Sequence, residues 1–431
     1  MRIGLEVHVT LPTKSKLFCS CSNGAEDPNS AICPICMGMP GSKPMLNAEA
    51  VRLAKTVSLG LGSSISNPMS FVRKVYFYPD LPKSFQITQL DRPIGVGGKV
   101  RLWASGKSIG IRRVQIEEDP ARVVRGEGYS LLDFNRSGSP LIEIVTEPDI
   151  TSEAELREFV EELLSILTYS GIPKAETRAD LNISMSDSRV EVKNITGVSN
   201  MLAAARYEIA RQAGVLGGGG SVAVETRSFD EASMTTRSSR EKETDEEYGF
   251  IYEPDLADYN TEVIAAAKPI IAGERADAIA AHYGLSERTL RELVLNDGEA
   301  LRLLELGVRI NPGVCIGVVE ELKKIGRTGV SDKIVGELIT AVASGARPSA
   351  ELVDELEKGN VAGTRSAPVD KERIDAEIRK LIDERKELVD ECRMNKKALN
   401  FFVGIVVKRC NADPRYVAGR VAELIGPADG T

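Results

Sequence analysis

The 431-residue sequence predicts an α+β fold: a large, mostly antiparallel sheet with flanking helices, followed by an all-helical domain and a helical tail domain. Two observations favour this class. Strand-like alternation of apolar and polar residues recurs up to about residue 260, and helical spacing replaces it from about residue 262. We expect one domain at 1–260, a helical domain at 261–358 and a tail domain at 370–431, with a linker of small residues at 359–369.

Composition and charge exclude several classes of protein. Charged residues make up 27% of the chain and hydrophobic residues 42%, which is ordinary for a globular protein. A formal net charge of -8 argues against a generally basic coat, so any nucleic-acid contact must be a local patch. The first residues carry charges inside their apolar run, and no run of about 18 apolar residues follows. We therefore expect neither a signal peptide nor a membrane span, and a cytoplasmic protein.

The first expected element is a strand at residues 3–10, where apolar and polar residues alternate. Successive strand side chains point to opposite faces, so Glu6 and His8 share one polar face. A single histidine on a strand is more often a surface residue than a ligand, and this alternative stays open.

Four of the seven cysteines form a cluster, in which eleven residues separate Cys19-x-Cys21 from Cys33-Pro-Ile-Cys36. Two tight turns with this spacing can place four sulfur atoms tetrahedrally around Zn²⁺. In a reducing compartment such a cluster is more often a metal site than a pair of disulfides. Four thiolates leave no open coordination position, so the zinc would be structural; unmetallated or redox-active thiols are the alternative.

Residues 47–61 have helical spacing that ends at Gly60 and Gly62. Beyond this helix, Lys74, Tyr76 and Tyr78 share one strand face. That combination suits anion binding, although a packed tyrosine face is an equally good interpretation. The later segment Gly106-Lys107-Ser108 is not a phosphate-binding loop, because Arg101 occupies the position that requires glycine.

Acidic residues end the next long strand, at Glu117, Glu118 and Asp119. An apolar strand that leads into three carboxylates is a candidate site for a hard cation, and a solvated acidic run is the alternative. Ser152 and Glu155 then form a capping box, which predicts the start of a helix.

Residues 178–194 predict two strands joined by a turn at 186–188. Asp180 and Asn182 are poor strand formers, so their positions go against local preference, as functional residues often do. An ordinary solvated sheet face is the alternative. The polar faces of the predicted strands supply one candidate set: Glu6, His8, Lys74, Glu117, Glu118, Asp180 and Glu191. If this set converges it requires a cation, and Mg²⁺ with a lysine suits a nucleotide phosphate.

The last part of the chain is basic although the whole is acidic. Between residues 393 and 420, seven basic residues face one acid, Asp413. The basic residues are Arg393, Lys396, Lys397, Lys408, Arg409, Arg415 and Arg420. This is a local electropositive element that suits nucleic acid, with a mixed helical surface as the alternative.

Long motifs in the first 256 residues resemble the GatB/GatE family of tRNA-dependent amidotransferase subunits, and within it the GatB type. The matching stretches are the four cysteines and residues 4–8, 38–41, 73–83, 86–89, 117–119, 133–143, 178–184, 191–194 and 252–256. The helical remainder resembles the family more loosely. A GatE chain carries a synthetase-like insertion, for which 431 residues leave no room.

The resemblance implies a cradle-shaped catalytic domain that works with the partner subunits GatA and GatC. Such a domain uses ATP and Mg²⁺ to phosphorylate the side-chain carboxylate of mischarged Asp-tRNA(Asn) or Glu-tRNA(Gln). Ammonia, released from glutamine by GatA, then displaces the phosphate to give the amide.

The resemblance also assigns residues. Catalytic positions would be Glu6, His8, Glu117, Glu118, Asp180 and Glu191. Magnesium would be held by Glu6, His8, Glu118, Asp180 and Glu191. ATP or substrate would meet Lys74, Tyr76, Asn135, Arg136, Arg178, Asn182 and Lys193. The tail would bind tRNA through Lys396, Lys397, Lys408, Arg409 and Arg415.

The sequence departs from the family at two places. Gln115 stands where many relatives have histidine, and its neutral amide cannot carry a proton. Residues 174–177 also differ from the common pattern. Two other hypotheses remain open: a non-catalytic, zinc-stabilised tRNA-binding protein, and a glutaminase. The glutaminase would need a nucleophile beside a base, and the clustered cysteines fit metal binding better.

Overall fold

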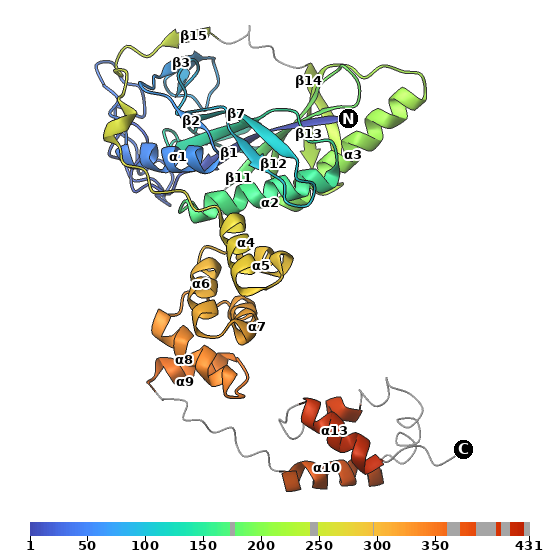
Figure 1. Ribbon diagram of the computed structural model, residues 1–431. Helices are drawn as coiled ribbons and strands as arrows, with labels where there is room; N and C mark the ends of the chain where they lie inside the picture. The colour runs from blue at the N-terminus through green and yellow to red at the C-terminus, as the bar shows by residue number, and fades with distance from the viewer. Residues whose placement is uncertain are drawn as a thin grey trace. The chain divides into compact units, whose positions relative to one another are not determined.

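The computed structural model describes residues 1–172, 177–241, 249–295, 297–359, 371–384, 402–406 and 414–425. They form two compact units, residues 1–305 and residues 306–431 (Figure 1). Residues 360–369 of the predicted linker lie outside the described residues, and the division into three domains stays a prediction.

Ten strands of the described residues form one large sheet in the first unit. Their order is β14-β13-β12-β11-β1-β10-β7-β5-β2, and β6 pairs with β7. The pairs are antiparallel except for β12 with β13, which confirms the predicted, mostly antiparallel sheet. The strands are β1 (Arg2–Thr10), β2 (Ser64–Ile65), β5 (Gly95–Val96), β6 (Lys99–Arg101), β7 (Ser108–Glu118), β10 (Pro140–Thr146), β11 (Thr177–Ser184), β12 (Val190–Thr196), β13 (Glu225–Asp230) and β14 (Thr235–Glu241).

Two smaller sheets complete the strands of this unit. One has the order β15-β3-β4, with β3 (Val72–Val75), β4 (Phe85–Thr88) and β15 (Gly249–Tyr252), and the other is the hairpin of β8 (Arg122–Gly126) and β9 (Tyr129–Asp133). Arg73 on β3 donates hydrogen bonds at 2.8 Å to both carboxylate oxygens of Glu253, which directly follows β15. This bidentate pair satisfies the buried Glu253 and ties the ends of the small sheet together.

Three helices cover one face of the large sheet: α1 (Ala48–Gly60), α2 (Glu153–Tyr169) and α3 (Val198–Gly217). The Ser152 side chain accepts a hydrogen bond from Glu155 N, which confirms the predicted start of α2. Leu156, Phe159 and Leu163 recur at helical spacing and are buried in the same core as the sheet.

The central strand β1 has two unlike faces, because its side chains alternate. Leu5, Val7 and Val9 belong to the core. Glu6 and His8 point to the other face, where they line a cavity together with Lys74 of β3. In Figure 1 the small sheet accordingly lies on the side of the large sheet opposite α2. The large sheet therefore offers an apolar face to the helices and a polar face to β3.

The remaining described elements are helical, as predicted. They include the 3-10 helix η3 (Thr261–Val263) and the α-helices α4 (Ala272–Tyr283), α5 (Glu287–Val294), α6 (Ala300–Ile310), α7 (Pro312–Lys324), α8 (Asp332–Ala343), α9 (Ala350–Glu357), α10 (Lys371–Glu384) and α13 (Pro414–Ile425). Ser331 caps α8, and α10 shares an apolar cluster with α13. No helix in the described part of the chain is long and apolar enough to cross a membrane.

Replacing Phe159 with alanine should lower the free energy of unfolding by about 3–5 kcal/mol, because it leaves a cavity between α2 and the sheet. Phe159 is 0% exposed, whereas Phe77 is 83% exposed and serves as the control. Phe77→Ala should change stability by about 0.5 kcal/mol or less. Denaturant unfolding followed by circular dichroism measures both, and equal effects would contradict the packing of α2 against the sheet.

Candidate active site

Strand register brings polar residues of four neighbouring strands into one row. His8 on β1 lies opposite Arg178 on β11 and Glu143 on β10, and Glu143 lies opposite Gln115 on β7. Residues that lie opposite each other in adjacent strands point to the same face of a sheet. The row therefore runs across the polar face of the large sheet.

The carboxylates of three glutamates lie close to the His8 side chain. His8 Nε2 lies 3.3 Å from Glu143 Oε2, 3.5 Å from Glu117 Oε1 and 3.8 Å from Glu6 Oε1. Ligand atoms of Glu6, His8 and Glu143 all lie within 4.8 Å of one another, a spacing that one metal ion can bridge. The structure thus brings together the predicted Glu6, His8 and Glu117, and it adds Glu143 to them.

The charged groups of this cluster shift one another's pKa values. Burial has the largest effect on Glu6 and Glu117, and the negative charge of Glu143 the next largest. Together they raise the pKa of each of the two carboxyl groups to about 7. Burial opposes the charge on His8, but the hydrogen bond to Glu143 and the nearby carboxylates raise the pKa of His8 to about 10. Acids so close together repel one another, and a divalent cation between them would remove that repulsion. The oxygen-rich donor set suits Mg²⁺.

One carboxylate oxygen of Glu143 accepts no hydrogen bond among the described residues and could bind a cation. Among the described residues, its buried Oε1 has no hydrogen-bond partner, and the guanidinium of Arg113 lies 3.6 Å from it. A buried carboxylate oxygen without a hydrogen bond is costly, so a ligand at this position would be stabilising. This orphaned oxygen supports the fit of the cluster to a metal ion.

Gln115 connects to the cluster through a threonine. Gln115 Nε2 donates to Thr88 Oγ1 at 3.3 Å, and Thr88 Oγ1 donates to Glu117 Oε2 at 3.2 Å. The amide at this position therefore orients Glu117 without carrying a proton.

A cavity of about 470 Å³ opens above the cluster. Lys74, Lys193 and Arg178 bring positive charge to its wall, and Tyr76 lines it too. Lys193 Nζ lies 3.7 Å from Asp180 Oδ2 and 3.7 Å from Glu191 Oε1. The predicted site residues Asp180 and Glu191 are therefore both close to the same ammonium group, that of Lys193. Asn182 and Glu191 line a neighbouring cavity.

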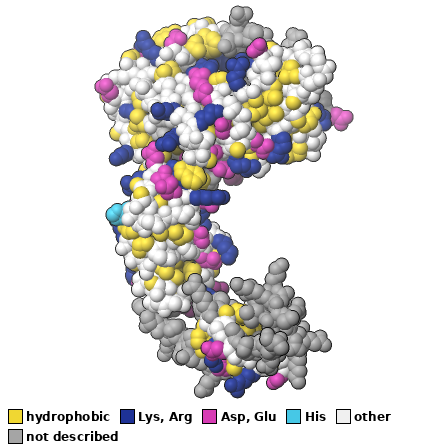
Figure 2. Space-filling model, turned by 45° about the vertical axis from the view of Figure 1, so that its right-hand side comes forward, with side chains coloured by type: hydrophobic (Ala, Val, Ile, Leu, Met, Phe, Trp, Pro, Cys, Tyr) yellow, Lys and Arg dark blue, Asp and Glu magenta, His cyan; other side chains and the backbone are white. Residues whose placement is uncertain are grey.

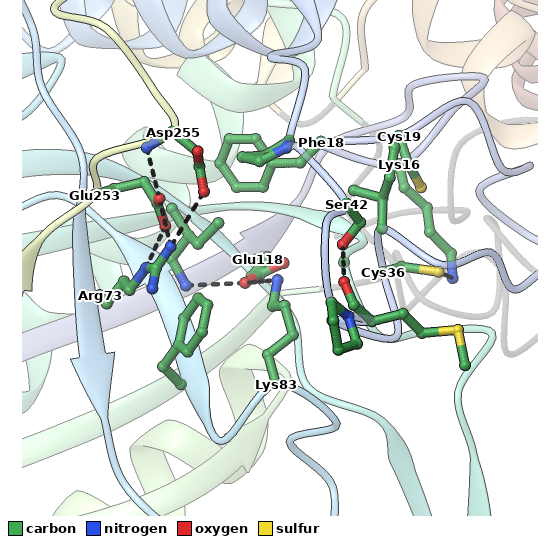
Figure 3. A pocket seen from close by; sticks show the side chains of 18 of the residues that line it. Lys16, Phe18, Cys19, Cys36, Ser42, Arg73, Lys83, Glu118, Glu253 and Asp255 are labelled. Carbon is green, nitrogen blue, oxygen red and sulfur yellow. Dashed lines mark hydrogen bonds and ion pairs between the residues drawn. The ribbon is translucent and has the colours of Figure 1, made fainter.

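Glu118, a predicted magnesium ligand, lies apart from the group of Glu6, His8 and Glu143. Adjacent strand residues point to different sides, so Glu117 and Glu118 line different cavities. The carboxylate of Glu118 forms a buried ion pair with Lys83 and accepts a hydrogen bond from Ile87 N at 2.9 Å. Figure 3 shows this pair in the second cavity, of about 270 Å³, which Arg73, Glu253 and Asp255 also line.

The structure does not place Asn135 or Arg136 beside the carboxylate cluster. The Asn135 side chain accepts a hydrogen bond from Ala31 N at 2.9 Å and so holds the loop between the cysteine pairs. Arg136 donates to the carbonyls of Pro120 and Ala121. The predicted tRNA contacts Lys396, Lys397, Lys408 and Arg409 lie outside the described residues, as does the side chain of Arg415.

The four cysteine sulfurs of Cys19, Cys21, Cys33 and Cys36 lie within 4.8 Å of one another, and this cluster can bind a metal such as zinc. Lys16 is 0% exposed, and its Nζ lies 3.7 Å from Cys36 Sγ and 3.1 Å from the Phe134 carbonyl. The hydrogen bond from Cys19, together with Lys16, lowers the pKa of the Cys36 thiol to about 4. A buried lysine beside the sulfurs would offset part of the negative charge of four thiolates around Zn²⁺.

Sequence reasoning missed Glu143, Arg113 and Lys16 as site residues. A signal existed for Glu143, because it is a single acid within the otherwise apolar segment Leu141-Ile142-Glu143-Ile144-Val145. A charged residue at a buried strand position needs a partner. Nothing in the neighbouring sequence names His8 as that partner, because strand register supplies it.

Comparison with known proteins shows the family to which the chain is similar. Residues 1–264 match the family described as GatB/GatE catalytic domain. Three similar proteins are each named as the B subunit of an aspartyl/glutamyl-tRNA(Asn/Gln) amidotransferase. The one from Sulfolobus acidocaldarius is 34% identical over 99% of this chain and 100% of its own length. That from Methanospirillum hungatei is 37% identical over 98% of both chains, and that from Persephonella marina is 34% identical over 98% of both.

The cysteine cluster gives a prediction about metal content. The purified chain should retain about one zinc ion after dialysis, and Cys36→Ser should lose it, because three thiolates bind zinc less tightly than four. Cys315→Ser is the control, since Cys315 is buried in α7, apart from the cluster. Elemental analysis measures the zinc. A wild-type chain without zinc, whose clustered thiols all react with a thiol reagent, would contradict the prediction.

Proposed function

The chain belongs to the GatB/GatE family, and from this premise we propose that it is the GatB subunit of a tRNA-dependent amidotransferase. In this proposal it converts mischarged Asp-tRNA(Asn), Glu-tRNA(Gln) or both into Asn-tRNA(Asn) and Gln-tRNA(Gln). The observation that carries the proposal is the cluster of Glu6, His8, Glu117 and Glu143, which shares one cavity with Lys74. A cluster of acids can bind a divalent cation, and a neighbouring lysine can bind phosphate oxygens. Both suit the transfer of a phosphoryl group.

The proposed reaction has two steps. An oxygen of the substrate side-chain carboxylate attacks the γ-phosphorus of ATP, the bond to ADP breaks, and an acyl phosphate forms. Ammonia then attacks the carbonyl carbon, and inorganic phosphate leaves with the bonding electron pair as the amide forms. The first step is needed because a carboxylate oxygen is a poor leaving group and phosphate is a good one.

Glu6, His8 and Glu143 are the residues that would hold Mg²⁺ in this proposal, and the ion would offset charge on the transferring phosphoryl group. Lys74 and Lys193 line the same cavity and attract phosphate oxygens. Thr88 fixes the direction of Glu117, and Lys193 lies between Asp180 and Glu191. Arg178 forms an ion pair with Asp119 at 3.0 Å, which holds its guanidinium at the cavity wall.

The other parts of the proposal lie outside this cavity. Zinc in the cysteine cluster would be structural. GatA would release ammonia from glutamine, GatC would complete the heterotrimer, and the tail domain at 370–431 would bind the tRNA. The proposed complex acts in the cytoplasm.

The proposal is tested with the purified chain, radiolabelled Asp-tRNA(Asn) or Glu-tRNA(Gln), ATP, Mg²⁺ and a high concentration of ammonium, which bypasses the partner glutaminase. ATP-dependent amide formation is expected with at least one of the two tRNAs. Glu143→Gln should lower the rate by roughly 10²-fold or more, because a charged ligand at the reacting phosphate is lost. Glu292→Gln is the control, since Glu292 is exposed on α5 and pairs only with Arg288 among the described contacts.

Isotope transfer tests the phosphorylation step separately. With ¹⁸O in the side-chain carboxylate of the mischarged tRNA, one ¹⁸O atom should appear in inorganic phosphate for each amide formed. Tight tRNA binding with neither amide nor ATP turnover, even after GatA and GatC are added, would instead favour the non-catalytic, zinc-stabilised tRNA-binding protein.

A further inference from the structure

A buried network of charged and polar side chains lies on the helix side of the large sheet. It joins residues of α3, β13 and β14, namely Glu208, Arg211, Gln212, Arg227 and Thr236. In Figure 2, Lys and Arg side chains are interspersed with Asp and Glu over the surface of the first unit. Glu208, by contrast, is 0% exposed, and Arg227 is 9% exposed. Charges that are removed from water in this way need partners, and the network supplies them.

Glu208 binds partners on both of its carboxylate oxygens. Oε1 accepts hydrogen bonds from Arg211 Nη2 at 2.6 Å and from Gln212 Nε2 at 2.9 Å. Oε2 accepts one from Thr236 Oγ1 at 3.0 Å, and Arg227 Nε lies 3.4 Å from it. Arg227 also donates to the hydroxyl and to the carbonyl of Thr236, both at 2.8 Å. One carboxylate of α3 therefore holds β13 and β14 at a single place.

Gln212 extends the network to β11. Its Nε2 donates to the carbonyl of Ile183 at 3.2 Å, and its Oε1 accepts a hydrogen bond from Met185 N at 2.9 Å. Gln212 is buried, so both ends of its amide find partners inside the protein. The network therefore fixes α3 against the end of β11, the strand that carries Asp180 and Asn182.

The same network opposes a change in the register of β12 against β13. These two strands are parallel and α3 connects them, so a hairpin turn does not set their register. In the observed register Glu191 lies opposite Thr226, and Val192 lies opposite Arg227. A shift by one residue would turn each side chain of β13 to the other face of the sheet. It would separate Arg227 from Glu208, and buried charges without partners strongly destabilise a fold.

The alternate side chains of β13 face the candidate active site. Thr226 Oγ1 donates to Glu191 Oε2 at 3.4 Å, and both side chains line the neighbouring cavity of about 660 Å³. Glu191 Oε1 lies 3.7 Å from the ammonium group of Lys193, which lines that cavity and the one above the carboxylate cluster. β13 therefore connects the two faces of the sheet: Thr226 contacts a predicted site residue, and the network holds Arg227, the next residue.

We propose that Glu208 and Arg227 are positioning residues for the proposed reaction. By holding β13 in register, they keep Thr226 against Glu191, and they keep Glu191 and Lys193 in place at the cavity wall. Buried polar groups can specify one arrangement of a fold, because other arrangements leave them unpaired. The inference rests on the proposed function and adds to it two residues that touch neither the substrate nor the cation.

The double variant Glu208→Met with Arg227→Met tests the proposal, because it removes both charges and keeps side chains of similar size. Amide formation is measured with the partner subunits, mischarged tRNA, ATP, Mg²⁺ and ammonium. We expect a folded chain whose kcat falls by about tenfold or more, since small displacements of site groups slow a reaction strongly. Hydrogen exchange, followed by mass spectrometry, should rise about tenfold in residues 190–196 and 225–230 and stay unchanged in α1. The control is Glu153→Met with Arg206→Met, an ion pair that joins α2 to α3 at the surface, and neither measurement should change.

A second pair of variants tests the contact with the site and leaves the network intact. Thr226→Val removes the hydroxyl that donates to Glu191, and it should lower kcat by roughly fivefold. Thr226→Ser keeps a hydroxyl and should regain most of the wild-type kcat. Neither variant should change hydrogen exchange in residues 225–230, because Arg227 keeps its partners.

A folded double variant with the wild-type kcat would overturn the proposal. So would a Thr226→Val chain with the wild-type kcat, and this measurement decides the matter if the double variant does not fold. A wild-type chain that forms no amide would contradict the proposed function instead. Hydrogen exchange then still tests the network: a rise confined to β12 and β13 in the double variant supports it, and a rise throughout the chain, or none, overturns it.

Discussion

Several carboxylates and one histidine converge on the polar face of the large sheet, and most of the candidate site follows from this convergence. Glu6, Glu117 and Glu143 lie within 3.8 Å of the same atom, His8 Nε2. Burial and mutual repulsion raise the pKa of Glu6 and Glu117, so the three acids carry full charge together only at a cost. The protein offsets part of that cost with His8 and with nearby lysines. A divalent cation would offset more, which is why the cluster suits phosphoryl chemistry.

The alternation of side chains along β7 separates two polar networks that are adjacent in sequence. Glu117 faces His8, whereas Glu118 pairs with Lys83 in the cavity beside the cysteine cluster. The cysteine loop packs closely on that pair: Gly38 has a φ of +65°, and a Cβ on it would lie 2.4 Å from Lys83 Cγ. A larger residue at position 38 would therefore displace Lys83. Cys19 and Cys36 of the cysteine cluster line the same cavity as Lys83 and Glu118.

Much of the fold could be predicted from the sequence because its local signals are strong. The alternation at 3–10, the hairpin at 178–194 and the cap at Ser152 each specify one element, and the structure has all three. The grouping of Glu6, His8, Glu117, Asp180 and Glu191 on one face followed from the same alternation. The structure places Glu118 in a different cavity from Glu117, because adjacent strand residues point apart, so its predicted role as a magnesium ligand stays a prediction. Glu143 was missed because only the pairing of β10 with β1 shows that it lies opposite His8.

Binding of Mn²⁺ by the zinc-loaded chain, followed by electron paramagnetic resonance without nucleotide, is the most direct test of a cation site at the carboxylate cluster. We expect about one Mn²⁺ per chain, held at the cluster of Glu6, His8 and Glu143. Glu143→Gln should weaken this binding about tenfold or more, and Glu118→Gln should leave it unchanged. If Glu118→Gln weakens Mn²⁺ binding and Glu143→Gln does not, the cation belongs to the other cavity and the proposed site is contradicted.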